Sequence, residues 1–198
     1  MFKIVKNLDA RAKRSRDALL KAGLQLLNSN KEASLSDIAN HAGVGRATLY
    51  RQFETREQLI KGIAIHCFNA IDTACLPINR KAKSGIDAIR LTFEYVIPLT
   101  QELQFLMKLD TLTEDDPEVL AIYRKQKQET VELVEYCKKE GSISNDFPTV
   151  WVTNLIEGLF FSAALTMEES MGDGHKVFTA KELAELSFKS FCRGVGGD

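Results

Sequence analysis

The sequence has few of the features that mark secreted, membrane-spanning or metal-binding proteins. Its four cysteines are scattered, and none belongs to a Cys-x-x-Cys pair of the kind that holds zinc or performs redox chemistry. The best apolar run, GLFFSAAL, is far shorter than the roughly 20 residues of a membrane-spanning helix. The N-terminus, MFKIVKNLDARAKRSR, is basic but lacks the apolar stretch of a secretion signal. We therefore expect a cytoplasmic protein with reduced thiols and no association with a membrane.

Catalytic signatures are also missing. The sequence contains no nucleophile–base–acid set, no phosphate-cradling glycine loop and no zinc-ligand spacing. Its three histidines are too dispersed for a metal triad, and the acidic run at 114–116 is typical of a helix cap. We expect no catalytic residue, no metal ligand and no cofactor. An enzyme with its active site in the acidic part of the chain is one alternative.

Charge is unevenly distributed along the chain, although the net charge is only −1. Residues 1–66 carry 12 lysines and arginines against 6 aspartates and glutamates, whereas residues 67–198 carry 14 against 21. The first third is therefore at +6 and the remainder at −7. This asymmetry predicts a polyanionic partner at one end of the molecule, although a simple drift of surface charge would produce the same numbers.

Apolar residues recur with helical spacing along almost the whole chain. Alternating β-branched runs and Asn-Gly hairpin turns are missing, so the sequence predicts an all-α fold. Helices are expected at about 10–28, 34–42, 45–53, 55–76, 84–98, 101–109, 117–141, 148–167 and 179–194. The segment PINRKAKSG, at 77–85, is expected to be a loop.

Several helix starts carry recognisable caps. Ser34 stands three residues before Asp37, and Thr179 three residues before Glu182, which is the spacing of a capping box. Asp116 precedes Pro117, a residue favoured at the first helical position. These pairs define where three of the expected helices begin.

Residues 36–53 have the pattern of a helix-turn-helix. Gly43 permits the left-handed backbone that a tight turn between two helices requires. Ile38, Leu49 and Phe53 are expected to form a small core beneath the turn. With those positions inward, a helix over GRATLYRQF presents a cationic and aromatic face, which suits the major groove of DNA.

The length and the hydrogen-bonding groups of each side chain on this face predict which part of the DNA it contacts. Arg46 can donate two hydrogen bonds to a guanine edge, while hydroxyl, amide and cationic groups suit phosphate oxygens. The expected DNA contacts are Ser36, Gly45, Arg46, Ala47, Thr48, Tyr50, Arg51, Gln52 and Arg56. A basic arm precedes them, formed by Lys3, Lys6, Arg11, Lys13, Arg14 and Arg16. Two interpretations of this arm stay open: it contacts phosphates or the minor groove, or it is a solubilising tail.

The stretch SLSDIANHAGVGRATLYRQFETREQL closely resembles the DNA-binding segment of TetR (tetracycline repressor) family regulators. The resemblance covers about residues 10–65. The matching positions are Ile38, Ala39, Ala42, Gly43, Val44, Thr48, Leu49, Tyr50, Phe53, Arg56, Glu57 and Leu59. Two positions depart from the family pattern, because Gly45 replaces the serine common at the recognition-helix cap and Arg56 replaces the usual lysine.

The resemblance implies a helix-turn-helix domain at 1–55 and a larger α-helical ligand-sensing and dimerisation domain at 56–198. A helix at about 56–76 would connect them. It also implies a homodimer whose last two helices form a four-helix bundle with those of the partner. The residues suited to that bundle are Leu155, Gly158, Leu159, Ser162, Ala163, Leu183, Leu186, Phe188 and Phe191. The alternative for each of them is the core of a single chain.

The resemblance further implies a small-molecule cavity in the larger domain. The candidates are aromatic residues with isolated polar groups nearby, namely Tyr95, Phe105, Tyr123, Gln126 and Glu157. Glu157 stands on an otherwise apolar helix, where it suits a cationic ligand or an arginine of the partner. Aromatic residues at helical spacing are also typical of ordinary core.

Taken together, these features predict a sequence-specific DNA-binding regulator that binds a palindromic operator as a dimer. We expect a repressor that an unknown small molecule releases from double-stranded DNA. The alternative is a DNA-organising or protein-regulated protein of the same fold with no small-molecule effector.

Overall fold

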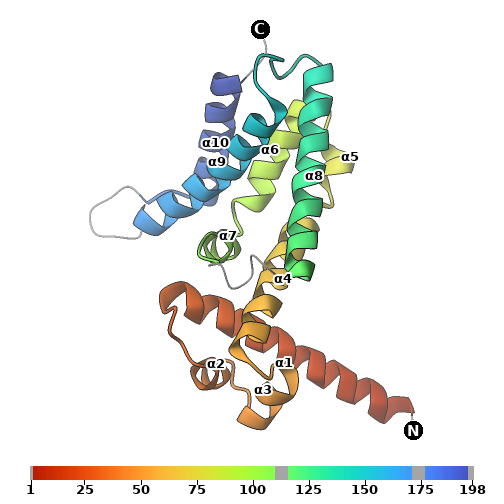
Figure 1. The fold of residues 1–198 in the computed structure, drawn as a ribbon, viewed down its shortest axis with the longest axis vertical. Coiled ribbons are helices and arrows are strands. Elements are labelled where there is room, and N and C mark those ends of the chain that lie inside the picture. The colour runs from red at the N-terminus through yellow and green to blue at the C-terminus, as the bar shows by residue number, and fades with distance from the viewer. Residues whose placement is uncertain (1, 110–115, 171–176, 196–198) are drawn as a thin grey trace.

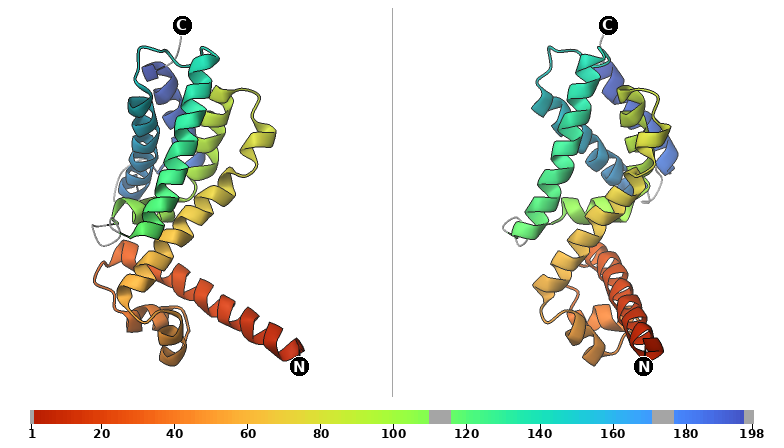
Figure 2. Two further views of the ribbon diagram at one scale, coloured as in Figure 1. Left: turned by 45° about the vertical axis from the view of Figure 1, so that its right-hand side comes forward. Right: turned by 90° about the vertical axis from the view of Figure 1, so that its right-hand side faces the viewer.

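The computed structural model describes residues 2–109, 116–170 and 177–195, and within these ranges it contains helices and no strand (Figure 1). The all-α fold predicted from the sequence is confirmed. Helices α1, α2 and α3 form one end of the elongated molecule, and α5 to α10 form the other (Figures 1 and 2). The long helix α4 runs from the first group into the second.

The smaller end consists of α1 (Phe2–Ser29), α2 (Leu35–His41) and α3 (Arg46–Gln52). The start of α2 is a reciprocal capping box, as predicted. The Ser34 hydroxyl accepts a hydrogen bond from the Asp37 backbone N–H at 3.2 Å, and the Asp37 carboxylate accepts one from the Ser34 N–H at 2.9 Å. These contacts satisfy backbone donors that a short helix would otherwise leave unpaired.

Helix α1 begins earlier than the predicted start near residue 10. Its 28 residues extend about 42 Å, well past α2 and α3 (Figures 1 and 2). The segment preceding residue 10 contains neither glycine nor proline, so nothing in it interrupts the helix. The helix therefore carries the basic arm on a regular backbone.

The turn between α2 and α3 adopts the conformation that its sequence predicts. Gly43 has a φ of 64°, in the left-handed region. The turn is closed by hydrogen bonds from the Gly43 N–H to the Asn40 carbonyl at 3.1 Å and from the Val44 N–H to the Ala39 carbonyl at 2.9 Å. This backbone shape sets the direction in which α3 leaves the turn.

Replacing Gly43 with alanine should destabilise the fold by about 1–2 kcal/mol, because a Cβ is strained in the left-handed conformation. Gly45→Ala is the matched control: its φ is −64°, and a Cβ there meets nothing within 4 Å. Urea unfolding of both variants measures the difference. Equal stability of the two variants would contradict the argument.

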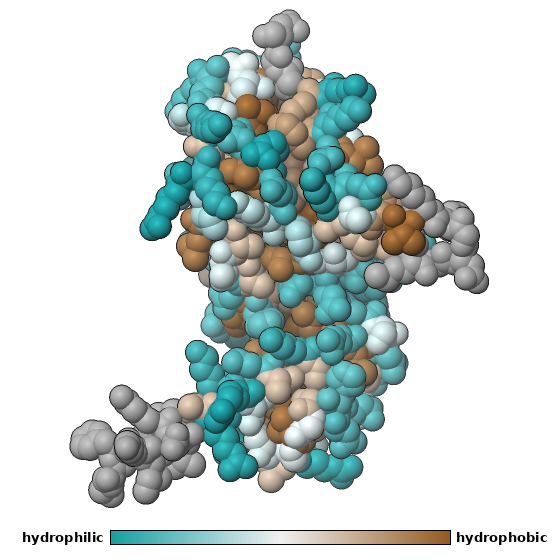
Figure 3. Space-filling view, turned by 180° about the vertical axis from the view of Figure 1, so that it is seen from behind, coloured by the Kyte–Doolittle hydropathy of each residue, from teal (hydrophilic) through white to brown (hydrophobic). Residues whose placement is uncertain are grey.

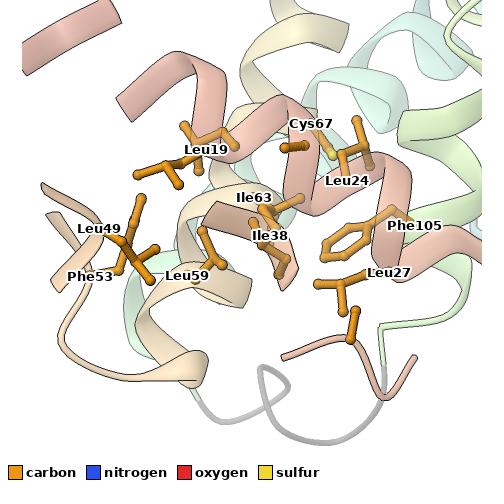
Figure 4. Packing of buried hydrophobic residues seen from close by; sticks show 14 of the residues in the cluster. Leu19, Leu24, Leu27, Ile38, Leu49, Phe53, Leu59, Ile63, Cys67 and Phe105 are labelled. Carbon is orange, nitrogen blue, oxygen red and sulfur yellow. The ribbon is translucent and has the colours of Figure 1, made fainter. Parts of the chain in front are cut away.

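A continuous hydrophobic core holds the smaller end together (Figure 4). Leu19 of α1, Ile38 of α2 and Leu49 of α3 are fully buried in it. Phe53, directly after α3, closes the core and is also buried, as predicted. The same cluster continues into α4 and reaches Phe105, so the two ends share one packed interior.

The larger end contains the remaining helices. They are α4 (Arg56–Cys75), α5 (Ile78–Lys81), α6 (Gly85–Val96), α7 (Thr100–Met107), α8 (Pro117–Lys139), α9 (Thr149–Ser170) and α10 (Ala180–Val195). A second core lies among α6, α8, α9 and α10, where Phe93, Val134, Ile156 and Phe191 are buried. Phe93 and Phe191 pack edge to face, with ring centroids 6.2 Å apart.

The prediction of a plain loop at 77–85 is wrong in part. Ile78–Lys81 forms one helical turn, α5, with Pro77 at its N-cap. Ile78 is buried against Ala88 and Leu91 of α6, so tertiary packing stabilises a turn that the composition of the segment does not favour.

The other predicted helix starts are confirmed. Thr55 caps α4 by accepting from the Gln58 N–H, and Asp116 caps α8 by accepting from the N–H groups of Glu118 and Val119. The Thr179 hydroxyl accepts from the Glu182 N–H at 3.2 Å, completing the capping box of α10. Pro98 follows the end of α6, as a proline that cannot continue the helix should.

Two helical stretches, Arg56–Lys81 and Thr149–Glu169, are long and apolar enough to cross a membrane by length and composition alone. Polar and charged residues interrupt both stretches, so neither is an unbroken apolar run. Helices in protein cores pass the same test, and α4 packs against α1, α6, α7 and α8. The two stretches are therefore weak evidence for a membrane span.

Candidate DNA-binding surface and effector residues

The outer face of α3 is cationic and aromatic. Arg46, Ala47, Tyr50 and Arg51 are all exposed, whereas Leu49 on the opposite side is fully buried. Tyr50 keeps 49% of its surface accessible, an unusual exposure for a tyrosine next to a core. The periodicity of the helix thus separates a packing side from a side free to enter a groove of DNA.

The flanks of this face carry smaller polar groups. Gly45 is the N-cap of α3 and has no side chain to cap it, as its sequence predicts. Thr48 and Gln52 are half-buried beside the exposed residues, and Ser36 is half-buried in the first turn of α2. Hydroxyl and amide groups in these positions suit phosphate oxygens.

Arg56 is engaged differently from the other predicted contacts. Its guanidinium donates a hydrogen bond to the backbone carbonyl of Lys31, in the loop between α1 and α2. The side chain is half-buried and ties the start of α4 to that loop. A guanidinium has further N–H donors, so Arg56 retains the ability to bind a phosphate while it braces the domain.

Arg16, from the basic arm, is part of the packing. Its guanidinium lies 4.5 Å from the centroid of the Phe53 ring, a cation–π contact, and donates to the Gln52 carbonyl at 3.4 Å. This residue supports the end of α3. The side chains of Lys3 and Lys6 lie outside the described side chains.

Two carboxylates near the candidate surface have lowered pKa values. The pKa of Asp37 lies below its ordinary value because its carboxylate accepts hydrogen bonds from the Ser34 side chain and backbone. The pKa of Glu57 is lowered chiefly by a hydrogen bond from its own backbone N–H and then by Thr55. Depressed pKa values mean that these contacts stabilise the fold at neutral pH and are lost on acidification.

In the larger domain, three polar side chains form a hydrogen-bonded network that joins α8 to α9. The Lys127 ammonium donates to the Tyr123 hydroxyl at 3.1 Å, and this hydroxyl donates to the Glu157 carboxylate at 3.2 Å. Lys127 also lies 3.6 Å from Glu157. The pKa of Lys127 is raised, first by the hydrogen bond to Tyr123. Glu157, predicted to face a cation, therefore pairs with a lysine of its own chain.

Gln126 directly precedes Lys127 on α8, and its side chain contacts α4. Its amide donates to the Phe68 carbonyl at 3.0 Å and to the Asp72 carboxylate at 2.6 Å. The Tyr123 ring lies 6.5 Å from the ring of Phe68. Tyr123, Gln126 and Glu157 thus lie where α4, α8 and α9 meet.

The other two predicted effector residues lie elsewhere. Phe105 is buried in the core that α1 and α4 share, so it packs between the two ends of the molecule. The Tyr95 hydroxyl accepts from the Lys81 ammonium at 2.8 Å, beside α5. The sequence grouped these residues by type. In the fold, Phe105 and Tyr123 contact the same hydrophobic core, whereas Tyr95 lies in a separate cluster beside α5.

The last two helices bury most of the residues that suited a dimer bundle. Ala163, Leu183 and Phe191 are buried within the chain, and Leu155, Leu159 and Phe188 pack against the same core. A different stripe of α9 stays accessible, formed by Trp151, Asn154, Gly158, Ser162 and Leu165. On one face of the molecule, Figure 3 shows hydrophobic residues interrupting the hydrophilic surface of the larger domain.

Trp151 is a residue of this stripe that the sequence alone does not mark as exposed, and 61% of its surface is accessible. The signal was its spacing, because Trp151, Gly158 and Leu165 stand seven residues apart on one helix face. Trp151 and Leu165, the latter exposed to 44%, are thus large apolar side chains on a stripe whose other members are small or polar.

Comparisons with known proteins agree with this architecture. Residues 19–63 match the family described as bacterial regulatory proteins, tetR family. The chain is 26% identical over 146 residues to the HTH-type transcriptional repressor LfrR of Mycolicibacterium smegmatis, covering 74% of this chain and 75% of the relative.

Solved structures share the fold. The TetR-like regulator LfrR from Mycobacterium smegmatis in complex with proflavine has a TM-score of 0.75 at 23% identity, covering 93% of this chain and 97% of that one. The ketosteroid regulator KstR2 of Mycobacterium tuberculosis has a TM-score of 0.76 at 13% identity, covering 92% and 95%. Regulators of this type bind operator DNA as dimers and respond to small-molecule effectors. Residues 19–63 thus carry the DNA-binding domain of the TetR family, and the chain as a whole is similar to TetR-family regulators, which are DNA-binding transcription factors and not enzymes.

Proposed function

We propose that this protein binds a palindromic operator as a homodimer and represses transcription until a small molecule binds its larger domain. The observation that carries the proposal is the exposed face of α3, held outward by the burial of Leu49. In this proposal residues 1–55 read the DNA and residues 56–198 sense the effector and dimerise. A regulator of bacterial DNA acts in the cytoplasm, where we place this chain.

The proposed contacts divide into reading and anchoring groups. Arg46 reads a base edge, because its fork of donors is exposed near the start of α3. Gly45 and Ala47 have little or no side chain and allow close approach of the backbone. The remaining residues bind phosphate oxygens, namely Ser36, Thr48, Tyr50, Arg51, Gln52 and Arg56.

The dimer interface is proposed along α9 and α10. The accessible stripe of α9 has Gly158 at its centre, which permits close approach of a second helix. Leu186 on α10 is 50% exposed and adds apolar surface. A two-fold operator requires two reading heads at a defined spacing, which a dimer supplies and a monomer does not.

The effector is proposed to be an aromatic cation. The support comes from the relative crystallised with proflavine and from Glu157, whose carboxylate accepts a hydrogen bond from the Tyr123 hydroxyl. A ligand cation can replace the Lys127 ammonium as the partner of Glu157, so its binding would break a contact between α8 and α9. A ligand acts on DNA binding only through different affinities for the two states of the protein.

Selection of random duplex DNA by the purified protein, at two salt concentrations, tests the proposed function. Enrichment of a palindrome at the higher salt supports a dimeric sequence-specific regulator. Binding that vanishes with salt and enriches no sequence contradicts it and favours the DNA-organising alternative.

Glu157→Gln should weaken binding of proflavine at least tenfold, because loss of a charge-assisted contact costs about 1.5–3 kcal/mol. Fluorescence titration of the protein with proflavine measures the affinity. Glu129→Gln is the matched control, since Glu129 is an exposed glutamate of α8 paired with Lys125. An unchanged affinity in Glu157→Gln, or an equal loss in both variants, would remove Glu157 from the proposal.

A further inference from the structure

A groove of about 560 Å³ lies between α1 and α3, next to the exposed face of α3. Its lining residues are Arg11, Ala12, Ser15, Gly43, Val44, Gly45, Thr48 and Arg51. All of them are described, and none is acidic. The charged groups of the groove are therefore two arginines, one on each helix.

Arg11 and Arg51 are exposed, and neither makes an ion pair or hydrogen bond within the described part of the chain. Arg16, little more than one turn further along α1, contrasts with them, because Phe53 and the Gln52 carbonyl engage its guanidinium. The basic arm thus divides into a packing residue and a residue at the edge of an open groove.

The contents of the groove favour an extended anion. Two like charges on facing walls repel each other, and an anion between them turns that repulsion into attraction to both. The Ser15 and Thr48 side chains add hydroxyl groups, which bind phosphate oxygens. Arg51 also belongs to the exposed face of α3, so the groove is continuous with the surface proposed to enter the major groove.

We propose that this groove holds the sugar–phosphate backbone of DNA beside the half-site read by α3, with Arg11 and Arg51 on either side of one strand. The proposal rests on the proposed function and adds α1 to the elements that contact DNA. Arg11 positions the duplex without reading bases, so its contribution depends on salt and not on sequence.

Arg11→Ala tests the proposal, with Arg14→Ala as the matched control. Arg14 is exposed on the same helix, has no partner within the described residues and does not line the groove. Fluorescence anisotropy at several salt concentrations measures the affinity for the selected duplex, and ethylation interference locates the phosphates involved. Thermal unfolding of both variants verifies that they fold.

Arg11→Ala should weaken binding about tenfold, as expected for a lost hydrogen bond to a charged group. It should lower by about one the slope of log affinity against log salt concentration. It should also remove the ethylation interference at phosphates flanking the half-site. Arg14→Ala should leave the slope and the interference pattern unchanged. Arg11→Ala combined with Arg51→Ala should cost less than the sum of the two, because both contact one strand.

Wild-type affinity in Arg11→Ala, or an equal loss in Arg14→Ala, would overturn the groove proposal and leave the operator proposal intact. Failure to select any duplex would instead refute the operator proposal. In that case the same pair of variants is measured on an unrelated duplex, where equal affinities would overturn the groove proposal as well.

Discussion

Gly158→Gln should convert the proposed dimer into a monomer and reduce operator affinity by about 10²–10⁴-fold. The reduction is the avidity lost when two reading heads are no longer linked. A glutamine side chain at the centre of the α9 stripe would separate two helices that must approach closely. Analytical ultracentrifugation measures the change in mass, and DNA titration measures the change in affinity.

The isolated fold should tolerate this substitution. A Cβ at Gly158 meets nothing within 4 Å in the single chain, and glutamine favours a helix over glycine by about 0.5–1 kcal/mol. Loss of the dimer in a chain that still folds would therefore place the interface on this face. Ala121→Gln, on an exposed position of α8, is the control and should remain dimeric. A Gly158→Gln protein that stays dimeric and binds DNA normally would refute the α9 interface.

Arg46→Ala should lose about 1–3 kcal/mol of specific binding and relax the preference for one base pair in each half-site. The cause is the loss of a bidentate contact to a base edge, which carries sequence information. Affinity for an unrelated duplex should change much less. Competition between the selected operator and single-base variants of it measures the loss of discrimination.

Arg51→Ala is the comparison, because Arg51 lies on the same helix and is proposed to bind phosphate. It should weaken the operator and an unrelated duplex by similar factors and flatten the salt dependence. Arg56→Ala should do the same and also lower the unfolding temperature, since Arg56 holds the Lys31 carbonyl. Identical behaviour of the Arg46 and Arg51 variants would contradict the division into reading and anchoring residues.

The helix-turn-helix could be predicted from the sequence because its determinants are local. A capping box at Ser34, a left-handed glycine at 43 and a buried Leu49 each depend on residues within one turn. Once Leu49 is placed inward, helical periodicity alone predicts that Arg46 and Tyr50 are exposed, and the rest of the chain is not needed for this prediction. For this reason the sequence by itself determined the recognition helix, the all-α fold and most helix starts.

Tertiary structure decided which of several similar residues perform which task. Arg11 and Arg16 lie on one helix, yet only packing against Phe53 distinguishes a bracing arginine from one beside an open groove. Phe105 and Tyr123 are both aromatic residues that contact one core, but Phe105 is buried in it, whereas Tyr123 is half-buried and donates a hydrogen bond to Glu157 of a distant helix. Helical spacing in the sequence specifies which residues share one face of a helix. Which other helix packs against that face depends on the arrangement of helices that are far apart in the sequence.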